Sequence, residues 1–319
     1  MYEDIKIIIV IISAISLFIF GLQSFSKEIQ NIGTERLSTW IKKITKLPLG
    51  GFFLGGIITA VIQSSTMVSS LTVTLVNSGV IGFKDSILIL LGTNIGNTST
   101  AWIVSANSYL IGPIFIVLGS MISLVPTKLA VAGKSIFYFG FIFFSLTLLS
   151  DAMEPIKNNV VLLNILSHAS HPLMGILYGI MITVLIQSSS IVVGLVIVLV
   201  TQGSMDIGTA IPIVIGANIG TTSTALLVSM KFSSLSKIVA LAASLFNLVG
   251  VIFMIPLFGV LESIAVSFSS EPALQVAIAF TISNTVNSVF FLIFLKPTLA
   301  LLKKHRWYKQ HLIEQENNV

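Results

Sequence analysis

The chain has 319 residues, of which 55% are hydrophobic and only 9% are charged, and its mean hydropathy is +1.01. A water-soluble globular domain does not carry so apolar a composition over this length, so we predict an all-α integral membrane protein embedded in a lipid bilayer. The net charge of +5 is no sign of nucleic-acid binding, because a membrane protein is expected to carry cytoplasmic Lys and Arg, and we expect no nucleic-acid partner. The absence of cysteine excludes disulfides and thiolate metal sites.

The N-terminal apolar segment predicts a first membrane helix over residues 5–26. It is preceded by Glu3 and Asp4, where a signal peptide would carry positive charge, and no small-residue cleavage site follows it. We therefore expect this helix to be kept in the mature protein. The residues after it, 27–47, read as a polar connector.

The next apolar stretch, residues 49–79, is interrupted at its centre by Gln63-Ser64-Ser65-Thr66. As one straight helix it would be about 46 Å long, whereas a hydrocarbon core is about 30 Å thick. We predict a helical hairpin whose two arms meet at the polar motif and whose ends lie on the same side of the membrane. A full span that is broken at the motif is the alternative.

The helix predicted over 86–105 carries a second polar motif, Gly92-Thr93-Asn94-Ile95-Gly96-Asn97-Thr98-Ser99-Thr100. Its amide and hydroxyl groups recur at helical spacing. A further membrane helix is predicted over 109–131.

The same series of elements then recurs 124 residues later without a gap. The first motif, Gln63-Ser64-Ser65-Thr66, recurs as Gln187-Ser188-Ser189-Ser190. The second motif, which begins at Gly92, recurs as Gly216-Ala217-Asn218-Ile219-Gly220-Thr221. The repeated elements are a helix over 134–150, a connector over 151–171, a broken stretch over 172–203, and helices over 207–230 and 235–261. We place the first repeat at 1–131, the second at 132–261, an extra C-terminal transmembrane helix at 262–302, and a basic tail at 303–319.

The distribution of basic residues predicts the orientation in the membrane. If both broken stretches are hairpins, each repeat crosses three times, so the second repeat is inverted relative to the first. This arrangement puts 15 of the 17 Lys and Arg residues on the cytoplasmic side, against 13 if both stretches cross fully. We therefore predict a multi-pass protein of the cell membrane with its N-terminus outside and its C-terminus in the cytoplasm.

The two breaks predict the position of a binding site. Backbone groups exposed at mid-membrane depth have to be buried in protein or line a water-filled cavity. The second arm of each hairpin begins at the break, so its free amides favour an anion, while carbonyls, hydroxyls and the Gln amide oxygen favour a small cation. Broken helices at corresponding positions of two inverted repeats are typical of transporter sites.

Several of these polar residues also have purely structural interpretations. Serines and threonines in membrane helices commonly serve helix packing, but two glutamines in the same register of two apolar segments are hard to attribute to packing. For Asn247, Asn284 and Asn287, hydrogen bonds between helices explain the residues as well as ligand contact does. We expect His168 and His171 to lie at the membrane interface.

The central parts of the predicted apolar spans contain no Asp, Glu, Lys, Arg or His. A proton-coupled carrier needs a titratable group inside the membrane, so the sequence favours coupling to sodium through neutral oxygens. Neither Gly-x-Ser-x-Gly nor His-Glu-x-x-His occurs, so we do not expect an enzyme.

The paired Gln-Ser-Ser motifs, each followed by an Asn-Ile-Gly segment, resemble the type II sodium-dependent phosphate cotransporter family, and the chain is similar to its short bacterial members. The resemblance covers about residues 20–297. It implies an inverted-repeat fold that imports inorganic phosphate together with sodium, with no cofactor besides these coupling ions. Two positions depart from the family pattern, because Thr66 stands where the family has serine and Asn97 stands where the second repeat has Thr221.

The resemblance also implies roles for particular residues. Phosphate binding is implied for Ser64, Ser65, Thr66, Ser188, Ser189, Ser190, Asn94 and Asn218. Sodium binding is implied for Gln63, Gln187, Thr98, Thr100, Thr221 and Thr224. The alternatives left open are a sodium-coupled carrier of another oxyanion or of a carboxylate, and a passive anion channel or exporter.

Overall fold

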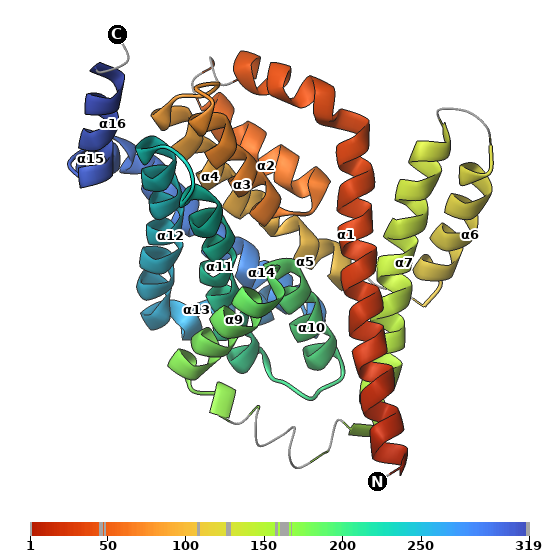
Figure 1. Cartoon of the computed structure of the whole chain (residues 1–319). Coiled ribbons are helices and arrows are strands. Elements are labelled where there is room, and N and C mark those ends of the chain that lie inside the picture. Colours follow the sequence, from red (N-terminus) through yellow and green to blue (C-terminus); the bar gives the residue numbers. More distant parts are fainter. Residues whose placement is uncertain are drawn as a thin grey trace.

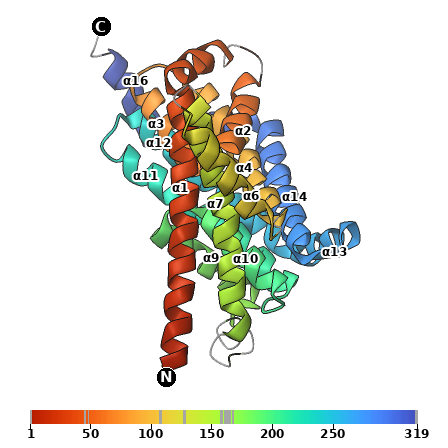
Figure 2. The same cartoon turned by 90° about the vertical axis from the view of Figure 1, so that its right-hand side faces the viewer.

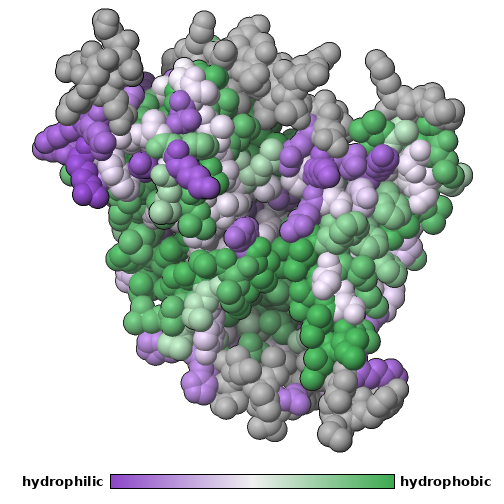
Figure 3. All heavy atoms as spheres, viewed as in Figure 1, coloured by the Kyte–Doolittle hydropathy of each residue, from purple (hydrophilic) through white to green (hydrophobic). Residues whose placement is uncertain are grey.

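The computed structural model describes residues 2–44, 47, 49–106, 109–125, 129–156, 159, 166 and 168–316. These residues form helices joined by short turns, and no strand occurs among them, which confirms the predicted all-α class. Six segments are long and apolar enough to cross a membrane. They are 6–30, 83–105, 130–153, 207–229, 234–268 and 272–293. A green hydrophobic band crosses the middle of the molecule between more hydrophilic ends (Figure 3).

The first half of the chain contains α1 to α6. Their bounds are α1 Tyr2–Ile44, α2 Gly50–Ile62, α3 Ser65–Asn77, α4 Phe83–Asn97, α5 Ser99–Ser105 and α6 Ile111–Ser123. The second half contains α7 Leu129–Met153, η1 Glu154–Ile156, α9 Pro172–Ile186, α10 Ser189–Thr201, α11 Ile207–Ser229, α12 Ser234–Met254, η2 Ile255–Leu257 and α13 Phe258–Phe268. The chain ends with α14 Pro272–Ile293, α15 Leu295–Lys303 and α16 Arg306–Glu316.

Both predicted breaks are present and have the same backbone geometry. Gln63 and Gln187 end α2 and α9 in the left-handed conformation, each with φ 59°, and Ser64 and Ser188 are extended. A non-glycine residue in this conformation costs about 1–2 kcal/mol. The surrounding packing therefore holds the same strained turn twice, which is what the repeated motif predicted.

Each broken stretch is a hairpin rather than a full span. The glycines of α2 contact α4 in parallel register, with Gly51 against Leu88 and Gly55 against Ile89, and α4 begins only a short turn after α3 ends. Since α2 and α4 run in the same direction, α3 has to return to the end at which α2 began. The contacts of α9 with α11, such as Gly179 with Ile213, establish the second hairpin in the same way.

The two hairpins face each other at the centre of the molecule (Figure 1). In this view α2 and α3 lie in the upper half, α9 and α10 lie in the lower half, and the termini lie at opposite ends. α1, α6 and α7 form a group at one side and cover the front of the molecule in the turned view (Figure 2). The inverted symmetry of the two repeats, and the repeat limits at 131 and 261, stay predictions.

Several predicted bounds were wrong. The connector at 27–47 is helical up to Ile44, because α1 continues where no proline stops it, and its C-terminal part turns aside in Figure 1. The helix predicted over 109–131 is only α6, since Pro126 follows soon after its end and disfavours helix before it. At about 20 Å, α6 is shorter than the hydrocarbon core of about 30 Å.

Other predicted helices are divided. The helix over 86–105 is interrupted at Thr98, between α4 and α5. The helix over 235–261 ends at Met254, because Pro256 follows in the short η2, and the C-terminal segment 262–302 is shared among α13, α14 and α15. Residues 157–158, 160–165 and 167 of the connector 151–171 lie outside the described residues, while His168 and His171 are exposed.

Close helix crossings at glycine hold each hairpin to its neighbour. A Cβ atom at Gly92 of α4 would lie 1.9 Å from the Phe52 carbonyl oxygen of α2, and one at Gly216 of α11 would lie 2.4 Å from the Ile176 carbonyl oxygen of α9. The backbones of α2 and α9 cannot move away cheaply, because each of these helices is one arm of a hairpin.

We expect Gly92→Ala to destabilise the protein by about 1–3 kcal/mol through this overpacking. Thermal unfolding of the purified protein in detergent measures the effect. Gly259→Ala in α13 is the matched control, since nothing lies within 4 Å of its added methyl group. Equal melting temperatures for the two variants would contradict the crossing geometry.

Candidate functional site

The tips of the two hairpins meet. The Thr66 hydroxyl, in the first turn of α3, donates a hydrogen bond of 3.4 Å to the main-chain carbonyl of Gln187 at the end of α9. The two breaks are therefore neighbours, although 121 residues separate these two positions. This convergence is the geometry that the repeated motif predicted.

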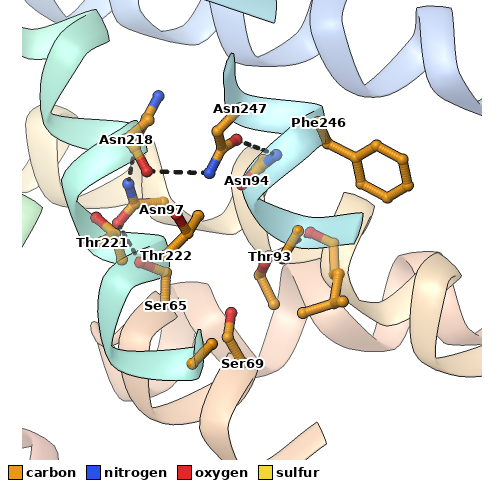
Figure 4. Close-up of a pocket in the computed structure, with 13 residues that line it drawn as sticks. Ser65, Ser69, Thr93, Asn94, Asn97, Asn218, Thr221, Thr222, Phe246 and Asn247 are labelled. Atoms are coloured by element: carbon orange, nitrogen blue, oxygen red, sulfur yellow. Dashed lines mark hydrogen bonds between the residues drawn. The ribbon is translucent and has the colours of Figure 1, made fainter. Parts of the chain in front are cut away.

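Asn97, at the end of α4, joins the two hairpins. Its amide oxygen accepts from the Ser65 hydroxyl at 3.1 Å, and its amide nitrogen donates to Ser189 at 3.3 Å and to Asn218 at 3.2 Å. The side chain is 4% exposed. One amide thus connects α3, α10 and α11, and Figure 4 shows it between Ser65 and Asn218.

Gln63 is bound into the first repeat. Its side chain, 5% exposed, donates to the Ser99 hydroxyl at 2.8 Å and to the Ala60 carbonyl, and it accepts from the Thr100 hydroxyl at 2.8 Å. Thr100 also lies 3.3 Å from the Ser190 hydroxyl oxygen. The start of α5 is therefore tied to the tips of both hairpins.

The hydrogen bonds that Gln63 makes in the first repeat have no counterpart at the equivalent residues of the second repeat, which the structure also describes. Gln187 corresponds to Gln63, but its side chain is exposed. Thr224 corresponds to Thr100, and its buried hydroxyl has no hydrogen-bond partner among the described residues. The two repeats therefore share their backbone break and differ in whether the glutamine is engaged.

A polar cavity lies between α3, α4, α11 and α12 (Figure 4). It is lined by Ser65, Ser69, Leu90, Thr93, Asn94, Asn97, Asn218, Thr221, Thr222, Ala225, Ala243, Phe246 and Asn247. Of the predicted site residues, Ser65, Asn94, Asn218 and Thr221 line it. The predicted residues that do not are Gln63, Ser64, Thr66, Thr98, Thr100, Gln187, Ser188, Ser189, Ser190 and Thr224.

Sequence reasoning missed part of the lining. Asn97, Thr93 and Thr222 belong to the Asn-Ile-Gly segments, so their motif membership was the available signal. Ser69 lies one helical turn after Ser65 on α3. For Asn247 of α12, the sequence allowed either a hydrogen bond between helices or contact with a ligand. The structure shows that Asn247 lines the cavity and that its amide oxygen also accepts a hydrogen bond from Asn94 at 3.0 Å.

Four of the hydroxyl groups that line the cavity already use their protons in hydrogen bonds within the protein. Thr93, Thr221 and Thr222 donate to main-chain carbonyls of their own helices, at 2.7, 3.1 and 2.7 Å. Ser65 donates to Asn97. A hydroxyl has one proton and two lone pairs, so in this arrangement the cavity is offered lone pairs, which suit a cation.

Donors suited to an anion lie at the hairpin tips. The first-turn amides of α3 and α10 have no helical carbonyl to bond, and they carry the positive ends of the helix dipoles. The Ser64 hydroxyl already accepts from the Met67 amide at 3.3 Å. No group of three or more His, Asp or Glu side chains able to hold a metal ion occurs in the described part of the chain. Neutral groups thus form the site.

Comparison with known proteins matches a family model described as Na+/Pi-cotransporter to this chain twice, over residues 17–151 and 147–262. The chain is 26% identical over 288 residues to an uncharacterised Bacillus subtilis protein, YqeW, covering 90% of this chain and 94% of that one. It is 26% identical over 298 residues to the putative inorganic phosphate export protein YjbB of Escherichia coli, covering 92% of this chain and 54% of YjbB.

A shorter match reaches an animal protein. Over 103 residues the chain is 36% identical to the human sodium-dependent phosphate transport protein 2B, covering 31% of this chain and 15% of that protein. No solved structure matches the chain.

Proposed function

This chain belongs to the Na+/Pi-cotransporter family, a family of transporters and not of enzymes, and we propose that it imports inorganic phosphate by coupling it to sodium. The observation that carries the proposal is the meeting of two polar breaks beside a cavity lined by neutral amides and hydroxyls. The sodium-dependent phosphate transport named for the human relative agrees with it.

In this proposal the hairpin tips bind phosphate. Ser64, Ser65 and Thr66 begin α3, and Ser188, Ser189 and Ser190 begin α10, so both sets of first-turn amides converge on one region. Helix N-termini bind phosphate groups through these amides and the helix dipole. Hydroxyls of the same residues can rotate to donate to the phosphate oxygens, and no fixed positive charge is needed.

Sodium occupies the neutral oxygens beside the tips. The proposed ligands are Gln63, Gln187, Thr98, Thr100, Thr221 and Thr224. The lone pairs that Thr221 and its neighbours direct into the cavity support this assignment. Coupling requires that bound sodium raises the affinity for phosphate, and linkage makes this effect reciprocal.

We further propose that the two glutamines alternate. In the described conformation Gln63 bonds Ser99 and Thr100, while Gln187 is exposed and the Thr224 hydroxyl is unpartnered. In the opposite conformation Gln187 bonds Thr224 and Gln63 is released. The exchange of equivalent hydrogen bonds keeps the two states close in energy while the cavity opens to one side and then the other. The C-terminus faces the cytoplasm in this proposal.

Uptake into proteoliposomes tests the function. We expect radiolabelled phosphate to accumulate above its external concentration when an inward sodium gradient is imposed, and not when choline replaces sodium. Unlabelled sulfate and dicarboxylates should not compete, whereas arsenate should. Sodium-independent equilibration without accumulation would contradict the proposal and indicate a channel.

Export is the second candidate, favoured by the printed name of the relative YjbB. Proteoliposomes loaded with labelled phosphate separate the two directions. Loss of phosphate from the lumen that does not depend on sodium, with no uptake on a sodium gradient, would establish export. Uptake that requires the gradient supports import.

A further inference from the structure

A second cavity adjoins the first on the side of α14. It is lined by Ile215, Asn218, Asn247, Gly250, Val251, Met254, Ser283, Asn284 and Asn287, from α11, α12 and α14. Asn218 and Asn247 line both cavities. α14 lies beyond the part of the chain that the family model matches, so this helix adds residues that the repeated motifs do not contain.

Main-chain carbonyls fix the orientation of three amides here. The side-chain nitrogens of Asn247, Asn284 and Asn287 donate to the carbonyls of Asn218, Phe280 and Phe246, at 3.0, 2.8 and 3.2 Å. A carbonyl oxygen can only accept, so it has to face the nitrogen of each amide. The three amide oxygens are consequently the ends that do not face these carbonyls.

The other polar side chains of this cavity also use their hydrogen atoms in bonds to oxygen atoms of the protein. Ser283 donates its hydroxyl proton to Phe280 at 3.0 Å, and Asn218 donates to the amide oxygen of Asn284 at 2.9 Å. Ser283 and Asn284 are 3% and 2% exposed, and none of the lining residues is charged. The cavity is therefore buried, neutral and rich in oxygen lone pairs.

These properties select the class of ligand. An anion needs donors, whereas the donors described above are bonded to carbonyl oxygens. Calcium and magnesium are bound largely through carboxylates, and this cavity has none. Carbonyl-type oxygens can replace the hydration shell of a monovalent cation, as they do in ion channels.

We propose that this cavity binds a small monovalent cation through oxygens of Asn247, Ser283, Asn284 and Asn287. The choice of sodium as its physiological ion rests on the proposed function, but binding itself does not require phosphate transport. Because Asn218 and Asn247 form a common wall, a cation in this cavity fixes that wall of the first cavity and thereby favours ligand binding there.

Gly250 gives a way to disturb the cavity without removing an oxygen. A Cβ atom at this position would lie 2.3 Å from Cγ of Asn287 and 2.4 Å from its amide oxygen. The Asn287 amide thus lies directly against the glycine. Gly250→Ala displaces it, while every candidate ligand remains in the chain.

Equilibrium binding of radiolabelled sodium to the purified full-length protein, in phosphate-free buffer, tests the proposal. We expect Ser283→Ala and Gly250→Ala each to bind about one sodium ion fewer per chain than the unmodified protein. Ser283→Ala is mild for folding, because the Phe280 carbonyl keeps its bond from Asn284.

The controls make the same chemical changes outside the cavity. Ser263→Ala in α13 removes an exposed hydroxyl that donates to the Gly259 carbonyl at 2.8 Å, and Gly259→Ala adds a methyl group in open space. Sodium binding by Ser283→Ala and Gly250→Ala equal to that of these controls would overturn the site. If sodium binding is lost as expected but the unmodified protein moves no phosphate, the cation site stands and the proposed function fails.

Discussion

Asn97→Ala is expected to reduce sodium-driven phosphate uptake to the background of empty liposomes. The substitution removes three hydrogen bonds, to Ser65, Ser189 and Asn218, and these are the bonds that hold the two hairpin tips around one centre. Three buried partners lose a bond together, so the stability falls by about 3 kcal/mol at roughly 1 kcal/mol for each bond. Uptake per folded protein, together with thermal unfolding, measures both effects.

Two further variants separate loss of the site from loss of the fold. Asn97→Thr introduces the residue found at the equivalent position 221, and its single hydroxyl proton cannot replace two amide donors. We expect it to fold and still to lose most uptake. Asn77→Ala, at the other end of α3, removes an exposed amide whose oxygen accepts from the main-chain amide of Ser233 at 2.8 Å. It should keep normal uptake. Full uptake by Asn97→Ala would contradict the prediction that transport requires Asn97 to hold the two hairpin tips together.

The sequence predicted the hairpins because their signal is local. A polar Gln-Ser-Ser motif in an apolar stretch too long for one span has few solutions in a membrane, and both copies adopt the same left-handed turn. Gly92 and Gly216, which correspond in the two repeated motifs, make the close contacts of α4 with α2 and of α11 with α9. These features needed no knowledge of the remaining chain.

The features that the sequence did not predict depend on distant residues or on conformation. In the sequence, Asn97 only marked a position at which the first repeat differs from the second. Its place between Ser65 and Asn218 is seen only in the folded chain. Asn247 and Asn284 were ambiguous because an amide that bonds another helix and an amide that faces a cavity look alike in sequence. α6 and the helical end of α1 were misjudged because helix length was inferred from hydropathy alone.

The different environments of Gln63 and Gln187 could not be predicted, since identical motifs predict identical surroundings. One conformation of a duplicated site has to be asymmetric if the cavity is open to one side at a time. The structure describes one such arrangement, with one glutamine engaged and the other exposed. Its consequence is that equivalent substitutions in the two repeats are not equivalent in their effects.

We expect Gln63→Ala and Gln187→Ala both to abolish sodium-driven uptake but to differ in stability. Gln63→Ala removes the bonds to Ser99, Thr100 and Ala60 from a buried site, which costs about 2–3 kcal/mol. Gln187→Ala removes an exposed side chain, and such changes stay within about 0.5 kcal/mol. Both residues have φ 59°, so the backbone contribution of the substitution cancels in the comparison.

The measurement is thermal unfolding and uptake for both variants in the same lipid and salt. Alternation requires Gln187 in the state that this structure does not show, so its loss stops the cycle although it leaves the described state intact. Ser188→Ala, at the same tip, should behave like Gln187→Ala. Normal uptake by Gln187→Ala would show that Thr224 never receives this side chain, and a large loss of stability would show that Gln187 is already engaged.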